Sequence, residues 1–200
     1  MKFITGENQN NKITYFNDIL LANFQFDKLE CAFSYIHNFK TNESQPKYIH
    51  AHLRLPHHPY IYDSEGNYIS EEIKESDKNA YLEQLKFTEK KILELIDDIK
   101  NHSPNAVIIV LSDHGYRPEI NWENPTEKDL VRGFNVITAI YFPERDVILD
   151  ENISLVNVFR IFFNEYFDYE LEILEDRQIW YNPQKPYVHT DVSEKLSLEI

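Results

Sequence analysis

The sequence predicts an α/β fold in which helices flank a mostly parallel sheet. Residues 107–111 form a continuous apolar run, as in strands that are buried on both faces. The amphipathic segment 77–102 precedes this run, and the strand-like segment 47–53 precedes the helix. Strand, helix and strand in this order indicate a βαβ unit, whose right-handed crossover joins two parallel strands.

Composition predicts a single α/β domain over residues 1–200. The chain is 42% hydrophobic and contains 13 Phe and 13 Tyr, enough for a sizeable core. Its formal net charge of −14 argues against a nucleic-acid partner, because binding to phosphates requires Lys and Arg. With Cys31 alone, an internal disulfide is excluded. No signal peptide and no apolar run of ~20 residues is present, so we expect a soluble chain of undetermined localisation.

The first half of the chain is expected to contain one strand and one long helix. Residues 1–46 are expected to be helical or irregular, since apolar residues near position 33 recur at helical spacing. The strand 47–53 places His50 and His52 on the same face. The helix is expected to be capped by Asp77, to carry an apolar stripe beginning at Leu82 and to end at Ser103-Pro104.

The second half is expected to alternate short strands with one aromatic helix. After the strand at 106–111 comes a polar loop that includes Arg117, Trp122 and Pro125. The later elements are a strand at 134–142, a Phe-rich helix capped by Ser154, short strands at 173–174 and 179–181, and a surface tail at 183–200.

Asp113, His114 and Gly115 follow the buried strand directly. In open α/β sheets, ligands bind beyond the carboxyl ends of the strands. A carboxylate beside a neutral imidazole suits zinc or manganese. The alternative is an ordinary turn in which Asp113 binds backbone amides and His114 is merely exposed.

A second candidate cluster follows the strand at 47–53, where His52, His57 and His58 lie among prolines. If this strand neighbours the strand at 106–111, both strand ends lie at one edge of the sheet. His52 and His57 would then converge with Asp113 and His114. The alternative is a solvent-facing pair of histidines on a loop stiffened by proline.

Two blocks of sequence carry a family resemblance, with support from a third. They are Ala-His-Leu-Arg-Leu-Pro-His-His-Pro-Tyr at 51–60 and Ser-Asp-His-Gly-Tyr-Arg at 112–117, and Ser-Leu-Val-Asn-Val-Phe-Arg follows at 154–160. Over roughly residues 45–176 the chain resembles the sulfatase-like hydrolase/transferase branch of the alkaline phosphatase superfamily. The most similar members are bacterial and membrane-anchored, with the catalytic domain outside the cytoplasm.

The resemblance implies specific roles for five residues. Asp113 and His114 take the place of metal ligands for a divalent ion, with zinc or manganese favoured and magnesium or calcium as alternatives. His52 and His57 take the place of catalytic residues that bind the substrate anion or protonate the leaving group. Arg117 would contact the same anion, or would instead form a surface salt bridge.

The chain departs from the family pattern in its N-terminal part. Family members carry an N-terminal half that supplies an acidic metal ligand and the nucleophile, and no Ser or Thr in residues 1–45 has the expected setting. The resemblance therefore implies an alkaline-phosphatase-like fold that lacks its N-terminal half. Such a chain would bind metal weakly without turning over substrate.

The predicted function is the C-terminal part of a metal-dependent enzyme that cleaves or transfers a phosphate or sulfate ester. Its expected partners are an anionic ester substrate and either the missing N-terminal half or a homodimer mate bound through the helix at 155–167. The alternative is a non-catalytic module on the same fold that binds an anion or a partner protein.

Overall fold

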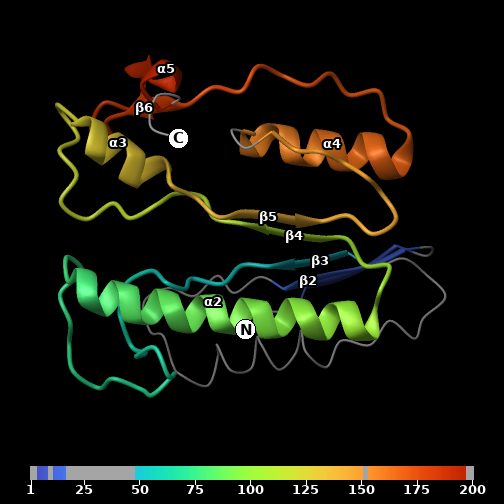
Figure 1. The fold of residues 1–200 in the computed structure, drawn as a ribbon, viewed down its shortest axis with the longest axis horizontal. Helices are drawn as coiled ribbons and strands as arrows, with labels where there is room; N and C mark the ends of the chain where they lie inside the picture. The colour runs from blue at the N-terminus through green and yellow to red at the C-terminus, as the bar shows by residue number, and fades with distance from the viewer. Residues whose placement is uncertain (1–3, 9–10, 17–47, 151–152, 197–200) are drawn as a thin grey trace. The chain divides into compact units, whose positions relative to one another are not determined.

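The computed structural model describes residues 4–8, 11–16, 48–150 and 153–196 (Figure 1). It divides into two compact units, residues 1–106 and residues 107–200, whose positions relative to one another are not determined. Among the described residues, no helix has both the length and the apolar character needed to cross a bilayer.

The first unit contains a small mixed sheet. Strand β1 (Ile4–Asn8) pairs antiparallel with β2 (Asn11–Phe16), and β2 pairs parallel with β3 (Tyr48–Ala51). The expectation that residues 1–46 are helical or irregular is therefore wrong for β1 and β2. β-Branched residues in both segments, joined by Tyr15 and Phe16 in β2, favour a pleated strand. The helical spacing near position 33 lies outside the described residues.

Helix α2 (Lys78–His102) confirms the long predicted helix and its cap. The Asp77 carboxylate accepts hydrogen bonds from the backbone N–H groups of Asn79 and Ala80, both at 3.0 Å. Of the predicted apolar stripe, Leu82 is 47% exposed, whereas the other members are partly buried: Leu85, Ile92, Leu95, Ile96 and Ile99. The fully buried residues of α2 are Gln84, Phe87 and Thr88, two of which are polar.

Aromatic packing fixes the segment between β3 and α2 onto the helix. The rings of Tyr62 and Phe87 lie 4.7 Å apart and form the centre of a small buried cluster. Gly66 turns the chain beside this cluster with a φ of +86°, and a Cβ there would lie 2.6 Å from the Phe87 ring. Hydrogen bonds from the Asn67 side chain and backbone hold the pKa of Asp63 below its usual value and brace the same turn.

The second unit begins with an antiparallel pair of strands. Strand β4 (Ile108–Leu111) pairs with β5 (Thr138–Tyr141), and α3 (Glu127–Phe134) lies between them in the sequence. Both strands were predicted, whereas α3 was not. The mixed α/β character is confirmed. Among the described strands β3 pairs with β2 and β4 with β5, so the mostly parallel sheet stays a prediction.

Helix α4 (Leu155–Phe167) packs against the chain just after β5. The rings of Phe142 and Phe162 lie 6.2 Å apart, and the Tyr166 hydroxyl donates to the Pro143 carbonyl at 2.8 Å. Ser154 occupies the N-cap position as predicted, but its side chain makes no capping hydrogen bond.

The predicted strand at 173–174 is wrong. The Asn157 side-chain amide donates to the Leu174 carbonyl at 2.8 Å, and its oxygen accepts from the Leu174 N–H at 3.0 Å. The Asn157 side chain of α4 thus forms the hydrogen bonds with the Leu174 N–H and C=O groups that a neighbouring strand would form in a sheet.

The chain ends in a hairpin and a short helix. Strand β6 (Ile179–Tyr181), which was predicted, pairs antiparallel with β7 (His189–Asp191), and α5 (Ser193–Leu196) follows. Residues 184–191 are exposed, as a surface tail would be, but Val192 is buried. In Figure 1, α3, β6 and α5 gather in one part of the second unit, and α3 contacts α5.

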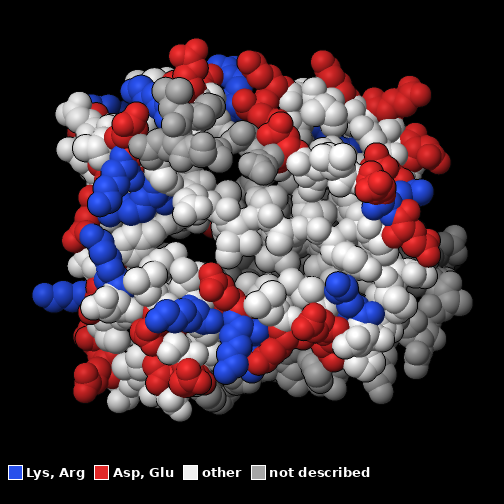
Figure 2. Space-filling model, viewed as in Figure 1, with Lys and Arg blue, Asp and Glu red and all other residues white. Residues whose placement is uncertain are grey.

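Lys and Arg side chains lie among Asp and Glu side chains on the face shown in Figure 2. Described ion pairs of this kind include Lys86–Glu83 at 2.7 Å and Lys185–Glu123 at 3.0 Å. On this face, acidic side chains are therefore partly neutralised by neighbouring cations.

Candidate functional site

Residues 52–62, which we name the His-Pro loop, leave the sheet at the carboxyl end of β3. His52 is the first residue after this strand, and its side chain is exposed. His57 is also exposed, and its backbone N–H donates to the Arg54 carbonyl at 2.9 Å. The two predicted catalytic histidines thus lie on one loop of the first unit.

The side chain of Gln84 on α2 is fully buried and anchors the His-Pro loop through hydrogen bonds. Its Oε1 atom accepts hydrogen bonds from the backbone N–H groups of Ile61 at 2.8 Å and Tyr62 at 3.2 Å. Its Nε2 atom approaches three backbone carbonyls, those of Pro56 (3.2 Å), His57 (3.1 Å) and Pro59 (3.3 Å). Sequence analysis missed this residue. The available signal was a Gln on the buried side of an amphipathic helix.

The neighbouring histidines of this loop have different surroundings. His58 is partly buried: its Nε2 lies 2.9 Å from the Ile73 carbonyl, and its ring packs edge-on against Tyr60. His57 is exposed, with its Nδ1 directed at the His58 carbonyl. Since a carbonyl only accepts hydrogen bonds, the His57 Nδ1 carries a proton. The Nε2 atom of His57 is then the ring nitrogen that remains available to a ligand.

Residues 112–117, which we name the DHG loop, are held by hydrogen bonds of their backbone and of the Ser112 side chain. Ser112 forms two hydrogen bonds with Ile137: its N–H donates to the carbonyl at 3.0 Å, and its Oγ accepts from the N–H at 2.9 Å. The Gly115 N–H donates to the Gly133 carbonyl at 2.9 Å. A Cβ at Gly115 would lie 2.1 Å from the Arg132 carbonyl oxygen. Glycine is required here by the close approach of the end of α3.

Helix α3, which contacts Gly115, begins in a well-formed capping box. The Thr126 Oγ1 accepts from the Asp129 N–H, and the Asp129 carboxylate accepts from the Thr126 N–H. These hydrogen bonds lower the pKa of Asp129, and its ion pair with Arg132 at 2.9 Å adds to the effect. The Thr-x-x-Asp spacing was the signal by which α3 could have been found.

Asp113 and His114 present their polar atoms together. His114 Nε2 lies 3.6 Å from Asp113 Oδ2, while His114 Nδ1 lies 2.8 Å from the Gly115 carbonyl. The carbonyl fixes the proton on Nδ1 and leaves the lone pair of a neutral ring on Nε2. The Asp113 side chain is 89% exposed, which disfavours the alternative of an acid that is consumed by backbone amides.

This pair is compatible with two neighbouring ligands of one ion. Ligand atoms about 2.1 Å from a tetrahedral zinc lie about 3.4 Å apart, close to the observed separation. A backbone carbonyl that accepts from the other ring nitrogen is the usual support for a ligating histidine. Within the described ranges, no group of three or more His, Cys, Asp or Glu residues could hold a metal.

Arg117 lies on an aromatic stack. Its guanidinium carbon is 5.8 Å from the centroid of Trp122, and Trp122 stacks on Trp180 with centroids 5.0 Å apart. Arg117 lies four positions after Asp113 in the sequence and is partly exposed, so the stack supports a cation close to the Asp113–His114 pair along the chain. The salt bridge that was the alternative role for Arg117 is not among its described contacts.

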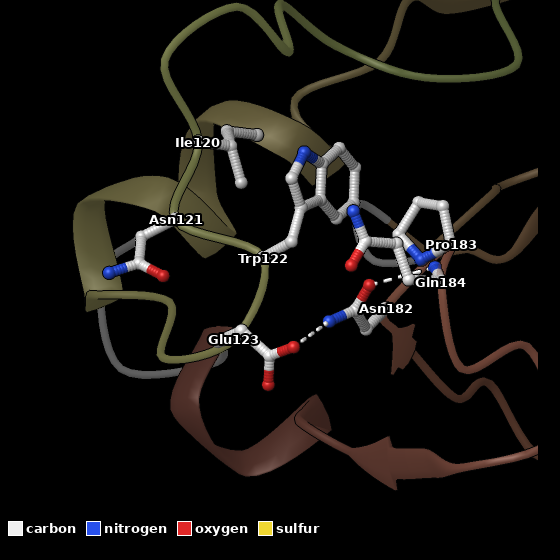
Figure 3. Close-up of a pocket in the computed structure, with 7 residues that line it drawn as sticks. All are labelled: Ile120, Asn121, Trp122, Glu123, Asn182, Pro183 and Gln184. Atoms are coloured by element: carbon white, nitrogen blue, oxygen red, sulfur yellow. Dashed lines mark hydrogen bonds between the residues drawn. The ribbon is translucent and has the colours of Figure 1, made fainter.

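A cavity of about 340 Å³ lies next to this stack (Figure 3). Glu123 lines it and accepts hydrogen bonds from Asn182 at 3.0 Å and from Lys185. The Asn182 oxygen in turn accepts from the Gln184 N–H at 2.9 Å. The bonds of Glu123 to Asn182 and Lys185 join the loop after Arg117 to the segment after β6. The residues that line the cavity are Ile120, Asn121, Trp122, Glu123, Asn182, Pro183 and Gln184.

The five predicted site residues divide between the two units. His52 and His57 share the His-Pro loop of the first unit. Asp113, His114 and Arg117 share the DHG loop of the second unit. The structure thus places the residues within each loop, and the convergence of the two loops stays a prediction.

The chain was compared with family models, with curated proteins and with solved structures. A family model described as Sulfatase matches residues 4–136, more than half of the chain. The matched range begins with β1 and includes both the His-Pro loop and the DHG loop. No curated protein and no solved structure matches the chain significantly.

Proposed function

The chain belongs to the sulfatase family, and on that premise we propose that it contributes to a metal-dependent centre that cleaves or transfers a phosphate or sulfate ester. The predicted membership of the alkaline phosphatase superfamily is confirmed. Members of the family typically use divalent metal ions. The observation that carries the proposal is the Asp113–His114 pair, with its fixed tautomer and its separation of 3.6 Å.

Asp113 and His114 are the residues that would hold the ion. Their oxygen and nitrogen donors favour zinc or manganese, and magnesium or calcium remain the alternatives. When bound, such an ion would neutralise charge on the ester oxygens and lower the pKa of an attacking hydroxyl. The Gly115 carbonyl keeps the His114 ring oriented for this role. Further ligands must come from outside this pair.

His57 is suited to protonate the leaving group. In its imidazolium form Nδ1 donates to the His58 carbonyl, so Nε2 is the donor that faces the substrate. As the bond from phosphorus or sulfur to the ester oxygen breaks, that proton moves to the departing oxygen and leaves His57 neutral. His52 and Arg117 would bind the remaining anionic oxygens by charge-assisted hydrogen bonds.

The nucleophile is not assigned to any described residue. The proposal therefore covers the metal-binding and anion-binding parts of the centre. It includes the prediction that this chain alone turns over little substrate until a segment bearing the nucleophile is added. Removal of a nucleophile abolishes most of the rate but spares the binding groups.

Zinc titration combined with assays on an aryl phosphate and an aryl sulfate tests this proposal. We expect zinc binding that is weakened by Asp113→Asn, and turnover only after addition of the nucleophile segment. The ratio of the two rates would separate phosphatase from sulfatase activity. Absence of zinc binding together with absence of activity after reconstitution would contradict the proposal.

One observation favours the second candidate, a non-catalytic module that binds a partner. Three Phe side chains on one side of α4 are exposed: Phe159 by 41%, Phe163 by 36% and Phe167 by 57%. Exposed apolar patches commonly mark interaction surfaces. A second copy of this chain is the partner proposed for α4. Sedimentation over a range of concentrations would detect a dimer, and Phe163→Glu should return it to a monomer.

A further inference from the structure

We propose that Gln84 is a positioning residue that holds His57 in place to meet the anionic ester. The inference rests on the proposed function of His57. Gln84 itself is fully buried and touches no substrate. Its influence passes through the backbone of the His-Pro loop, which it contacts on both sides of His57.

The two polar atoms of the Gln84 side chain contact different halves of the His-Pro loop. Its oxygen serves the second half by accepting from the N–H groups of Ile61 and Tyr62. Its nitrogen serves the first half, because its two hydrogens are shared among the carbonyls of Pro56, His57 and Pro59. A carboxamide supplies an acceptor oxygen and two donor hydrogens from one buried position, a combination that neither Glu nor Met of similar length provides.

The first half of the loop depends strongly on this nitrogen. Pro56 and Pro59 lack a backbone N–H, so these residues can be held by the backbone only through their carbonyls. The Gln84 amide reaches both carbonyls, at 3.2 Å and 3.3 Å. Without this donor the position of His57 would depend on the bond between its N–H and the Arg54 carbonyl and on the contacts of His58 and Tyr60 with the segment before α2.

Gln84→Glu separates the two functions with almost no change of shape. The new carboxyl still accepts from Ile61 and Tyr62. In its ionised form it faces the three carbonyls with a negative oxygen, and in the protonated form that burial favours it offers one donor hydrogen in place of two. We expect the Ile61 and Tyr62 amides to keep their hydrogen-exchange protection. The affinity of inorganic sulfate, measured from the shift of the His57 imidazole signal in NMR, should fall about tenfold, as expected when a buried polar group loses its partner.

Thr88→Val is the matched control. Thr88 is buried one turn further along α2, and its hydroxyl donates to the Gln84 backbone carbonyl rather than to the loop. This variant also loses a buried polar group but should leave the sulfate response of His57 unchanged. A fall in affinity as large as that of Gln84→Glu would overturn the inference, because general loosening of α2 would then suffice.

A measurement on the unaltered chain covers the case in which Gln84→Glu does not fold. The Gln84 side-chain amide protons should exchange slowly with solvent, and their NMR signals should shift when sulfate is added. Rapid exchange without any response to sulfate would overturn the inference.

Failure of the inference is distinguishable from failure of the proposed function. If Gln84→Glu loses no affinity for sulfate, the positioning role is wrong while the role of His57 stands. If His57 of the unaltered chain does not respond to sulfate at all, the proposed function is wrong, and the inference fails with it.

Discussion

The His-Pro loop and the DHG loop are fixed in different ways. A single buried side chain, Gln84, holds the first loop through five contacts with its backbone. The second loop is held by hydrogen bonds with the end of α3 and with Ile137 just before β5, and it has no room for a side chain at Gly115. The structure of the His-Pro loop should therefore depend on the hydrogen-bonding groups of Gln84, and that of the DHG loop on the absence of a side chain at Gly115.

The largest effect is expected from Gly115→Ala. The new Cβ would lie 2.1 Å from the Arg132 carbonyl oxygen and 2.8 Å from that of Asn135, so the backbone must move. We expect the free energy of unfolding to fall by about 3 kcal/mol, at the upper end for overpacking, as measured by urea denaturation.

Gly133→Ala is the control for this substitution. Its Cβ would meet Ile120 and Trp180 at ordinary distances of 3.5 and 3.6 Å. Since alanine is the better helix former, this variant should be neutral or more stable by up to about 1 kcal/mol. If both variants lose stability equally, backbone crowding at Gly115 is not what fixes the DHG loop.

Gln84→Met should have the next largest effect. It removes both the donor and the acceptor and leaves buried backbone groups unsatisfied, which should cost about 2 kcal/mol of unfolding free energy. The loss should be accompanied by faster exchange of the Ile61 and Tyr62 amides. An unchanged exchange rate at both amides would show that another contact holds the His-Pro loop.

Asp113→Asn should weaken zinc binding about tenfold, since it removes the charge of one ligand of the proposed pair. Isothermal titration calorimetry would measure the change. His102→Ala is the control, because His102 also lies near an acid, with its Nδ1 3.2 Å from Asp98 Oδ1, but belongs to neither loop. Equal losses in the two variants would indicate nonspecific binding of zinc to surface histidines.

The smallest effect concerns the hairpin of β6 and β7, outside both loops. Hydrogen bonds from Ser193 and the ion pair with Arg177 lower the pKa of Asp191 from 3.8 to about 2. Because the folded value is lower, Asp191 contributes stability above about pH 4, and this contribution is lost as the pH falls to 2.

Thermal unfolding followed by tryptophan fluorescence would detect this loss through Trp180 of β6. The midpoint of the unaltered chain should fall between pH 4 and pH 2, and Asp191→Asn should reduce that dependence. An identical pH dependence in the two proteins would assign acid sensitivity to other carboxylates.

Elements with a strong local signal could be predicted from the sequence. Examples are α2, with its Asp77 cap and helical spacing of apolar residues, and β4, with its apolar run. The sequence blocks at 51–60 and 112–117 indicated the family. The β1–β2 hairpin was missed because its strands lack alternation of polar and apolar residues. The role of Gln84 could not be predicted, since its partners are backbone groups more than twenty residues away in the sequence. Propensity and spacing describe neighbours along the chain, whereas these contacts depend on tertiary packing.

Paramagnetic broadening by Mn²⁺ tests most directly the prediction that both loops contribute to one centre. Mn²⁺ bound by Asp113 and His114 should broaden the imidazole NMR signals of His52 and His57, and His114→Ala should abolish the effect. Sharp signals from His52 and His57 while Mn²⁺ occupies the His114 site would contradict the account.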